Sequence, residues 1–160
     1  MGPLINEAAV RKAEAHVNDA LEKGATLLYG GTVAKGNFFH PTLLTGMRDD
    51  MRISHEETFA PVGALYSFSR EEEVIRRANN SHYGLAAYLF TRDMGRCMRV
   101  SEALEAGIVS VNEGIFSSPV APFGGFKMSG VGREGSHYGM EEYTEIKYTL
   151  MGYESQYGRH

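Results

Sequence analysis

Helical and strand-like patterns alternate along this 160-residue chain, and that alternation most constrains its fold. Apolar residues recur at helical spacing in 7–23, in the segment after Ser69 and in 93–104, with a short helix expected near 136–142. Between these segments lie short runs typical of strands. The alternation predicts an α/β fold with a partly parallel sheet. The expected strands or extended segments are 25–31, 35–47, 62–69, 83–91, 107–112 and 144–150.

Capping residues place the helix ends. Asn6 is a good N-cap for the first helix, and Gly24 is a good residue to end it. Ser69, followed by Glu72 three residues later, has the spacing of a capping box for the second helix. The apolar face that the first helix should turn toward a core is made of Val10, Ala13, Val17 and Leu21.

Composition excludes several function classes. The formal net charge is -4, so the chain lacks the basic excess typical of proteins that bind nucleic acid or anionic membranes. It contains no apolar run of the length that spans a bilayer. The single cysteine, Cys97, favours a reducing compartment, and we expect the cytosol. The expected partners therefore include neither nucleic acid nor membrane.

Residues 121–135, APFGGFKMSGVGREG, contain a G-x-G-x-x-G pattern at Gly130–Gly135. In a dinucleotide-binding unit such glycines join a strand to a helix inside a complete βαβ unit. Here the preceding residues PFGGFKMS have the composition of a loop, and too little chain follows for the rest of the unit. The segment is better explained as a turn-rich loop in which backbone approaches backbone.

Cys97 belongs to the helical segment 93–104, where it shares one face with Met94, Ser101 and Leu104. A free cysteine on such a face usually packs as a small hydrophobic residue. The six histidines are scattered, and none has metal-ligand spacing to Cys97 or to a carboxylate. We predict no metal site.

Several motifs occur in the order found in a known family. They include GPLINEAAVRKAEAHVNDALEKGATLLYGG, GNFFHPTLL, SHEETFAPV, ANNSHYGLAAYLFTRD, EALEAGIVSVNEGI and PFGGFKMSGVGREG followed by YGMEEYTEIK. Together they cover 2–153 and resemble the C-terminal third of the aldehyde dehydrogenase superfamily. GNFF, VNEGIFSS and GREGSHYGMEEYTEIKY resemble its succinate-semialdehyde branch in particular.

The resemblance implies a parent enzyme that uses NAD or NADP to oxidise an aldehyde. Residues 1–134 would be part of its catalytic domain, 135–153 a short helix and an oligomerisation strand, and 154–160 a frayed tail. The nucleotide-binding domain, the nucleophilic cysteine and the general-base glutamate would lie upstream. We therefore expect this chain alone to be inactive and to bind no cofactor. The alternatives are an assembly module that pairs through its last strand, a structural remnant, or a parent acting on another aldehyde.

The resemblance also assigns roles to single residues. Glu57 would accept hydrogen bonds from the nicotinamide ribose, and Phe59 would lie beside the nicotinamide, although Ala60 stands where the family pattern has glycine. Ser117 would face the substrate carboxylate, and Phe123 would line the tunnel to the aldehyde. Without the resemblance, the residues have simpler interpretations. Glu57 would be one of a solvated acid pair, Ser117 would be a turn residue, and Phe123 could equally be a core aromatic.

The C-terminal segment has implied structural roles. Arg133 and Glu145 would hold the glycine-rich loop and the last strand near a subunit contact, whereas as exposed charges they would contribute little. Ile146, Tyr148 and Leu150 alternate on one side of 144–150. In the family this strand reaches a neighbouring subunit, so we predict a homo-oligomer.

Overall fold

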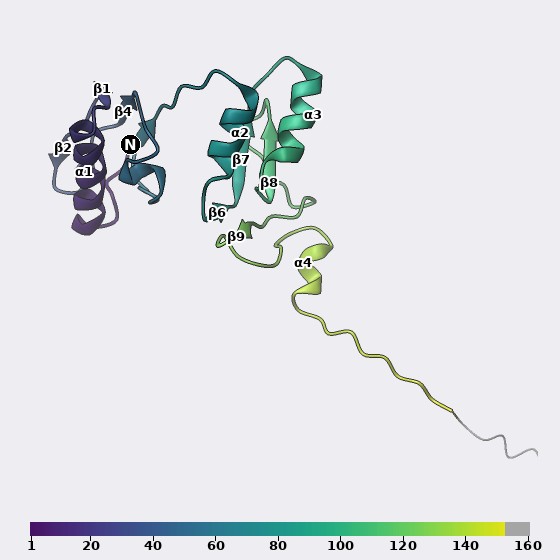
Figure 1. The fold of residues 1–160 in the computed structure, drawn as a ribbon. Helices are drawn as coiled ribbons and strands as arrows, with labels where there is room; N and C mark the ends of the chain where they lie inside the picture. The colour runs from purple at the N-terminus through teal and green to yellow at the C-terminus, as the bar shows by residue number, and fades with distance from the viewer. Residues whose placement is uncertain (153–160) are drawn as a thin grey trace, which may run out of the picture. The chain divides into compact units, whose positions relative to one another are not determined.

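The computed structural model describes residues 1–152, which form two compact units, 1–82 and 83–152 (Figure 1). The frayed tail expected at 154–160 lies outside the described residues. The described elements alternate helices with short strands, which confirms a mixed α/β fold. Two strand pairs are parallel, but the strands form small separate sheets instead of one sheet.

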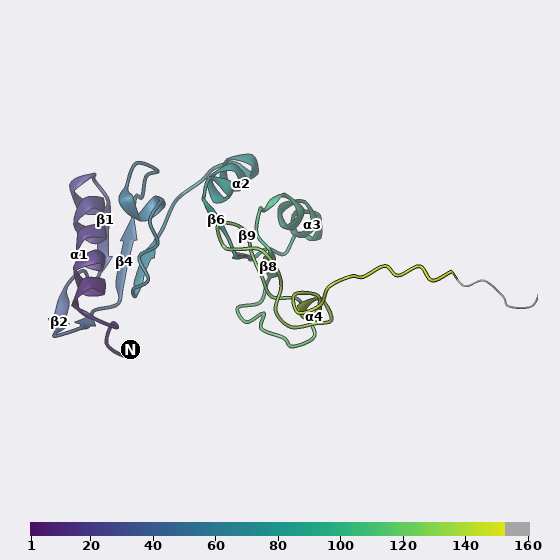
Figure 2. The same ribbon diagram turned by 90° about the horizontal axis from the view of Figure 1, so that it is seen from below.

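The first helix, α1 (Glu7–Glu22), begins and ends where its capping residues predict. The Asn6 side chain accepts a hydrogen bond from the backbone nitrogen of Ala9 at 2.9 Å. Gly24, at a φ of 93°, turns the chain out of the helix in a conformation that favours glycine. This helix lies alongside the strands that follow it (Figure 2).

Unit 1 contains a mixed three-stranded sheet and a small hairpin. In the sheet, the central strand pairs antiparallel with the first and parallel with the third. The three strands in spatial order are β1 (Thr26–Tyr29), β4 (Thr42–Thr45) and β5 (Val62–Ala64). The hairpin joins β2 (Val33–Lys35) to β3 (Phe38–Phe39), and a 3₁₀ helix, η1 (Arg52–Ser54), precedes β5.

The core of unit 1 forms where α1 meets these elements. Val10, Ala13 and Val17 are buried as predicted, together with Leu44 of β4. The predicted fourth position is wrong, because Leu21 is 36% exposed. The apolar stripe instead turns toward Ala20, and a histidine within the same face, His16, is fully buried.

The second helix, α2 (Glu71–Asn79), begins one residue later than the capping box predicts. Arg70 is its N-cap and makes no side-chain capping bond. Ser69 is hydrogen-bonded to Glu73 and not to the predicted Glu72. The Glu73 carboxylate accepts from the Ser69 backbone nitrogen at 3.2 Å and from the Ser69 hydroxyl at 3.3 Å. The strand expected at 62–69 is also shorter than predicted, since only β5 is formed.

Unit 2 is built around a parallel strand pair joined by a helix. The strand β7 (Ala86–Leu89) leads through α3 (Met94–Ala103) to β8 (Ile108–Val111). A second, antiparallel pair joins β6 (Tyr83–Gly84) to β9 (Phe126–Lys127), and the short helix α4 (Tyr138–Glu141) follows.

The helix α3 places Cys97 as predicted. Asp93 caps the helix by accepting from the Arg96 nitrogen at 3.1 Å. Cys97 and Val100 are both buried, whereas Met94 is 74% exposed and lies off the packed face. Cys97 is therefore a packing residue of this unit.

The glycine-rich segment 121–135 is mostly loop, as predicted, but it also contains the two-residue strand β9 in a stretch predicted to be loop alone. Gly130, Gly132 and Gly135 all have positive φ, and they lie between an antiparallel strand and a helix of four residues. A dinucleotide fingerprint instead joins a buried parallel strand to a long helix within a βαβ unit, and β9 and α4 are too short and wrongly paired to form one. Close backbone contact is evident at Gly107, where an added Cβ would collide with the carbonyl group of Gly124.

The segment 144–150 is not a strand within the single chain. It makes no ladder pairing among residues 1–152, and Ile146, Tyr148 and Leu150 are almost fully exposed. A strand forms only where a neighbour supplies hydrogen-bond partners. The described residues supply none, so a single chain does not test the predicted pairing with another subunit.

Candidate functional site

The predicted cofactor-contact residues lie in unit 1, on the segment 56–59 that follows η1. Alternate residues of this segment differ in their contacts. Glu56 and Thr58 bond to the buried His16 of α1, although the Glu56 side chain remains 44% exposed. Glu57 and Phe59 are exposed and make no hydrogen bond to His16. The distance is 3.0 Å from His16 Nε2 to Glu56 Oε2 and 2.9 Å from His16 Nδ1 to Thr58 Oγ1.

Charge also fixes this segment. Arg52 donates two hydrogen bonds to the Glu56 carboxylate, at 3.1 Å from Nε and 2.9 Å from Nη2. These bonds, followed by the bond from His16, lower the pKa of Glu56 to about 2. Arg52 is itself held by α1, since its backbone nitrogen donates to Asp19 at 2.8 Å. Glu56 is thus ionised at neutral pH and engaged on two sides.

Glu57 and Phe59 are left available on the outer side of the segment. Phe59 has a φ of 50°, rare for an aromatic residue, and is 83% exposed. A backbone in that conformation usually occurs where neighbouring contacts enforce it, often at a functional site. An exposed carboxylate beside an exposed ring suits a ligand that combines hydroxyl groups with a planar ring.

The predicted substrate residues lie together in unit 2. Ser117 and Phe123 line one cavity of about 500 Å³, here called the Ser117 cavity. Phe116 stacks on Phe123 with ring centroids 6.3 Å apart, and Tyr88 lies 5.5 Å from Phe116. One wall is thus aromatic and one edge carries a hydroxyl. The remaining lining residues are Ile108, Ser118, Pro119, Ala121, Pro122, Glu134 and Gly135.

Glu134 is a residue of this cavity that sequence reasoning missed. Its backbone pairs with that of Phe123 in both directions, at 2.8 Å and 2.7 Å, which fixes the aromatic wall. Two residues eleven positions apart in a glycine-rich stretch give no periodic signal for such pairing. The one sequence signal that links the two residues is that both belong to the family-like motif PFGGFKMSGVGREG.

Arg133 contacts the glycine-rich loop through its guanidinium group. Its Nη1 donates to the carbonyl oxygen of Gly132 at 2.7 Å and to that of Gly125 at 3.1 Å, and its guanidinium lies 5.6 Å from the centre of the Phe126 ring. Glu145 is exposed. The role of Arg133 and Glu145 in holding the last strand near a subunit contact stays a prediction.

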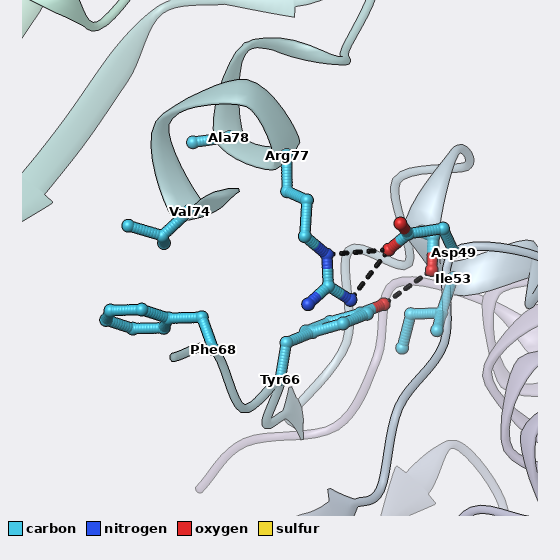
Figure 3. A pocket seen from close by; sticks show the side chains of 8 residues that line it. Asp49, Ile53, Tyr66, Phe68, Val74, Arg77 and Ala78 are labelled. Carbon is cyan, nitrogen blue, oxygen red and sulfur yellow. Dashed lines mark hydrogen bonds and ion pairs between the residues drawn. The ribbon is translucent and has the colours of Figure 1, made fainter. Parts of the chain in front are cut away.

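A second cavity, in unit 1, is lined by none of the predicted site residues (Figure 3). Arg77 donates to Asp49 from Nε at 3.0 Å and from Nη2 at 2.7 Å, and Tyr66 shares a 2.6 Å hydrogen bond with Ser54. Its polar groups are thus bonded to one another, which leaves an apolar interior. The other lining residues are Ile53, Phe68, Val74 and Ala78.

The described residues contain neither a group of metal-ligating side chains nor a membrane-spanning helix. Among residues 1–152, no three histidine, cysteine or acidic side chains gather in an arrangement that could hold a metal ion. The helices within that part of the chain are too short or too polar to cross a membrane. The candidate sites are thus the exposed side of 56–59 and the Ser117 cavity, each described within its own unit.

Comparison with known sequences supports the motif resemblance. The family model of the aldehyde dehydrogenase family matches residues 1–149. The chain is 54% identical over 154 residues to the NADP(+) succinate-semialdehyde dehydrogenase of Escherichia coli (strain K12), covering 95% of this chain and 32% of that protein. It is also 54% identical over 153 residues to the 3-sulfolactaldehyde dehydrogenase of Pseudomonas putida, covering 94% of this chain and 32% of that protein.

Comparison with solved structures gives the same result for the fold. The crystal structure described as an E. coli NADP dependent enzyme superposes with a TM-score of 0.93 at 54% identity, covering 96% of this chain and 32% of that one. The chain thus spans about a third of the length of the relatives it matches. On the family match and these identities, the chain belongs to the aldehyde dehydrogenase family.

Proposed function

We propose that this chain is the C-terminal third of a longer NAD(P)-dependent aldehyde dehydrogenase that oxidises succinate semialdehyde to succinate. The observation that carries the proposal is the 54% identity, over almost the whole chain, to a succinate-semialdehyde dehydrogenase. The second relative is named for 3-sulfolactaldehyde, which is also an aldehyde with an anionic group far from the carbonyl. Both names support a site that receives the anionic end of a short aldehyde.

The Ser117 cavity supplies a physical basis for that specificity. In our proposal the Ser117 hydroxyl donates to the far carboxylate of the substrate. The stacked rings of Phe116 and Phe123 cover its short carbon chain and keep water away. One hydroxyl compensates only part of the desolvation of a carboxylate. Upstream cationic residues, arginines by the resemblance, would provide the rest.

The exposed side of 56–59 would hold the nicotinamide end of the cofactor. Glu57 would accept hydrogen bonds from the ribose hydroxyls, and Phe59 would shield the nicotinamide from water. The nicotinamide cofactor supplies the acceptor for the hydride that leaves the aldehyde carbon. Glu57 and Phe59 suit the nicotinamide end of the cofactor, because an exposed carboxylate and an exposed ring lie two positions apart.

The covalent step would need residues from outside this chain. An aldehyde oxidised through a thioester requires a thiolate that reaches the carbonyl carbon. The single thiol here, Cys97, is buried on α3. In the proposal, residues 1–160 build walls and ligand contacts, and the chain alone does not turn over aldehyde.

The test is a substrate comparison in the longer enzyme. We expect kcat/KM to be highest for succinate semialdehyde, lower for 3-sulfolactaldehyde, and lowest for butanal, which has no anionic end. Catalytic efficiency that is equal for butanal and succinate semialdehyde would contradict the proposal. Highest efficiency for 3-sulfolactaldehyde would assign the same site to a sulfonate substrate, in line with the equal identity to that relative.

A non-catalytic assembly role is a second candidate, favoured by one observation. The segment 144–150 belongs to no helix or strand of residues 1–152 and exposes Ile146, Tyr148 and Leu150. Alternating apolar residues on an unpaired backbone suit pairing with a strand of another copy. This role is compatible with the enzymatic one, and a homo-oligomer is part of the proposal.

A further inference from the structure

His16 lies on a helix 40 residues before the segment it contacts, and no predicted role includes it. It is fully buried within the apolar face of α1, where Val17 and Ala13 are its neighbours. A buried imidazole is costly unless both ring nitrogens find partners. Here both do, and the two partners, Glu56 and Thr58, flank Glu57.

We infer that His16 is a positioning residue for Glu57 and Phe59. It holds the residues on both sides of Glu57, so the residue between them is forced to the opposite side of the backbone. The inference rests on the proposed contact of Glu57 with the cofactor ribose. It adds the group that would set the position of that contact.

The two ring nitrogens of His16 have different roles in these hydrogen bonds. Glu56 is ionised, with a pKa lowered to about 2, so its carboxylate accepts and His16 Nε2 is the donor. Nδ1 then bonds the Thr58 hydroxyl on the other side of the ring. Arg52 engages both oxygens of the same carboxylate, so Glu56 cannot rotate to follow the histidine.

Phe59 shows the backbone consequence. The residue after Thr58 has a φ of 50°, a conformation that costs free energy for a side chain with a Cβ. Thr58, immediately before it, and Glu56, three residues before it, are both bonded to His16 and supply contacts that such a conformation requires. Without the bond to Thr58, the segment is free to return to an ordinary φ, and the ring leaves its outward position.

Two substitutions separate positioning from simple stability. His16→Leu removes both hydrogen bonds, and His16→Gln keeps a donor and an acceptor in the side chain. Val17→Ala is the matched control, because it makes a cavity at a neighbouring buried position of α1 and removes no hydrogen bond to Glu56 or Thr58. Thr58→Val tests the second bond without altering the helix.

The first measurement is ¹⁵N relaxation on the 160-residue chain. We expect backbone order parameters at Glu57 and Phe59 to fall from about 0.85 to below about 0.6 in His16→Leu and in Thr58→Val. They should recover in part in His16→Gln and stay unchanged in Val17→Ala. Unchanged order parameters in His16→Leu, or the same fall in Val17→Ala, would overturn the inference whatever the cofactor chemistry.

The second measurement is kinetic, in the longer enzyme. We expect His16→Leu to raise the cofactor KM or lower kcat by about tenfold to a hundredfold, the size of a small misplacement. In a Glu57→Gln background the same change should have little further effect, because the group that His16 positions is already altered. Losses that multiply would overturn the inference. If Glu57→Gln alone changes nothing, the ribose contact fails, while the relaxation result still decides the role of His16.

Discussion

Two adjacent carboxylates, Glu56 and Glu57, have different surroundings. Glu56 is bonded to Arg52 and His16, which holds its pKa near 2, and so it is a structural anion. Glu57 is exposed and available to a ligand. The acid pair in EETF is visible in the sequence. Which of the two carboxylates is engaged within the fold depends on His16, 40 positions before Glu56.

The lowered pKa of Glu56 leads to a stability prediction. A carboxyl group whose folded pKa lies below its ordinary value of 4.5 stabilises the fold above that value, and the stabilisation is lost as pH falls toward about 2. We therefore expect Glu56→Gln to unfold at lower urea concentration than the unmodified chain at pH 7. The two should converge toward pH 2. A difference that persists unchanged at pH 2 would show that charge is not the cause; Glu72→Gln, in an exposed acidic run of α2, is the control.

Ser117 offers a prediction about specificity in the longer enzyme. Ser117→Ala should reduce kcat/KM for succinate semialdehyde by about tenfold or more, since a hydrogen bond to a charged group contributes roughly 1.5–3 kcal/mol. Butanal has no carboxylate and should lose little. Ser118→Ala, at the adjacent lining position, is the matched control. An equal loss on both substrates would reduce Ser117 to a turn residue.

At the scale of elements, sequence patterns predict types better than boundaries. Asn6 and Gly24 place the ends of α1, because each acts through its own local backbone. The start of α2 is missed by one residue, because Ser69 has acids at both third and fourth positions after it and the structure uses the fourth. The buried His16 is missed for another reason: its partners lie in a distant segment, and no local rule connects them.

The segment 144–150 carries the prediction for assembly. Because its apolar side chains are exposed and its backbone unpaired, we expect the 160-residue chain to form dimers or larger oligomers through it. Sedimentation equilibrium over a range of concentrations measures this. Ile146→Lys combined with Tyr148→Lys should shift the chain toward monomer, whereas Lys147→Ala, on the other side of the segment, should not. A chain that is monomeric at every concentration would contradict the prediction.

At the scale of the whole molecule, residues 1–152 hold the two proposed ligand-contact sites, and we assign no reaction centre among them. Residues 1–149 match the family, and relatives are about three times longer. The family and the α/β class follow from sequence motifs spread over most of the chain. The positions of the two units relative to one another do not follow, because the patterns that predict helices and strands act within each unit.

The whole-molecule prediction is the absence of turnover in the isolated chain. Fixing a flexible dinucleotide by its nicotinamide end alone leaves most of the association cost, about 4–15 kcal/mol in general, without compensation. We expect no reduced cofactor to appear when NAD or NADP and succinate semialdehyde are mixed with purified chain. The near-ultraviolet absorbance of the reduced cofactor is the measurement. Turnover that disappears in Cys97→Ser would assign the nucleophile to α3 and contradict the proposal.

The contact of Gly107 with Gly124 has a consequence for inheritance. The backbone before β8 passes so close to the glycine-rich loop that any Cβ at Gly107 would collide with the carbonyl group of Gly124, and with the Cα of Gly125 at 3.0 Å. Every amino acid that a single-base change of a glycine codon can encode carries a Cβ. Every missense change of the Gly107 codon should therefore be harmful. In a population of genes encoding this protein, we expect only silent changes to accumulate at that codon. At Gly2 and Gly114 an added Cβ meets nothing within 4 Å, so we expect missense changes to be better tolerated there than at Gly107.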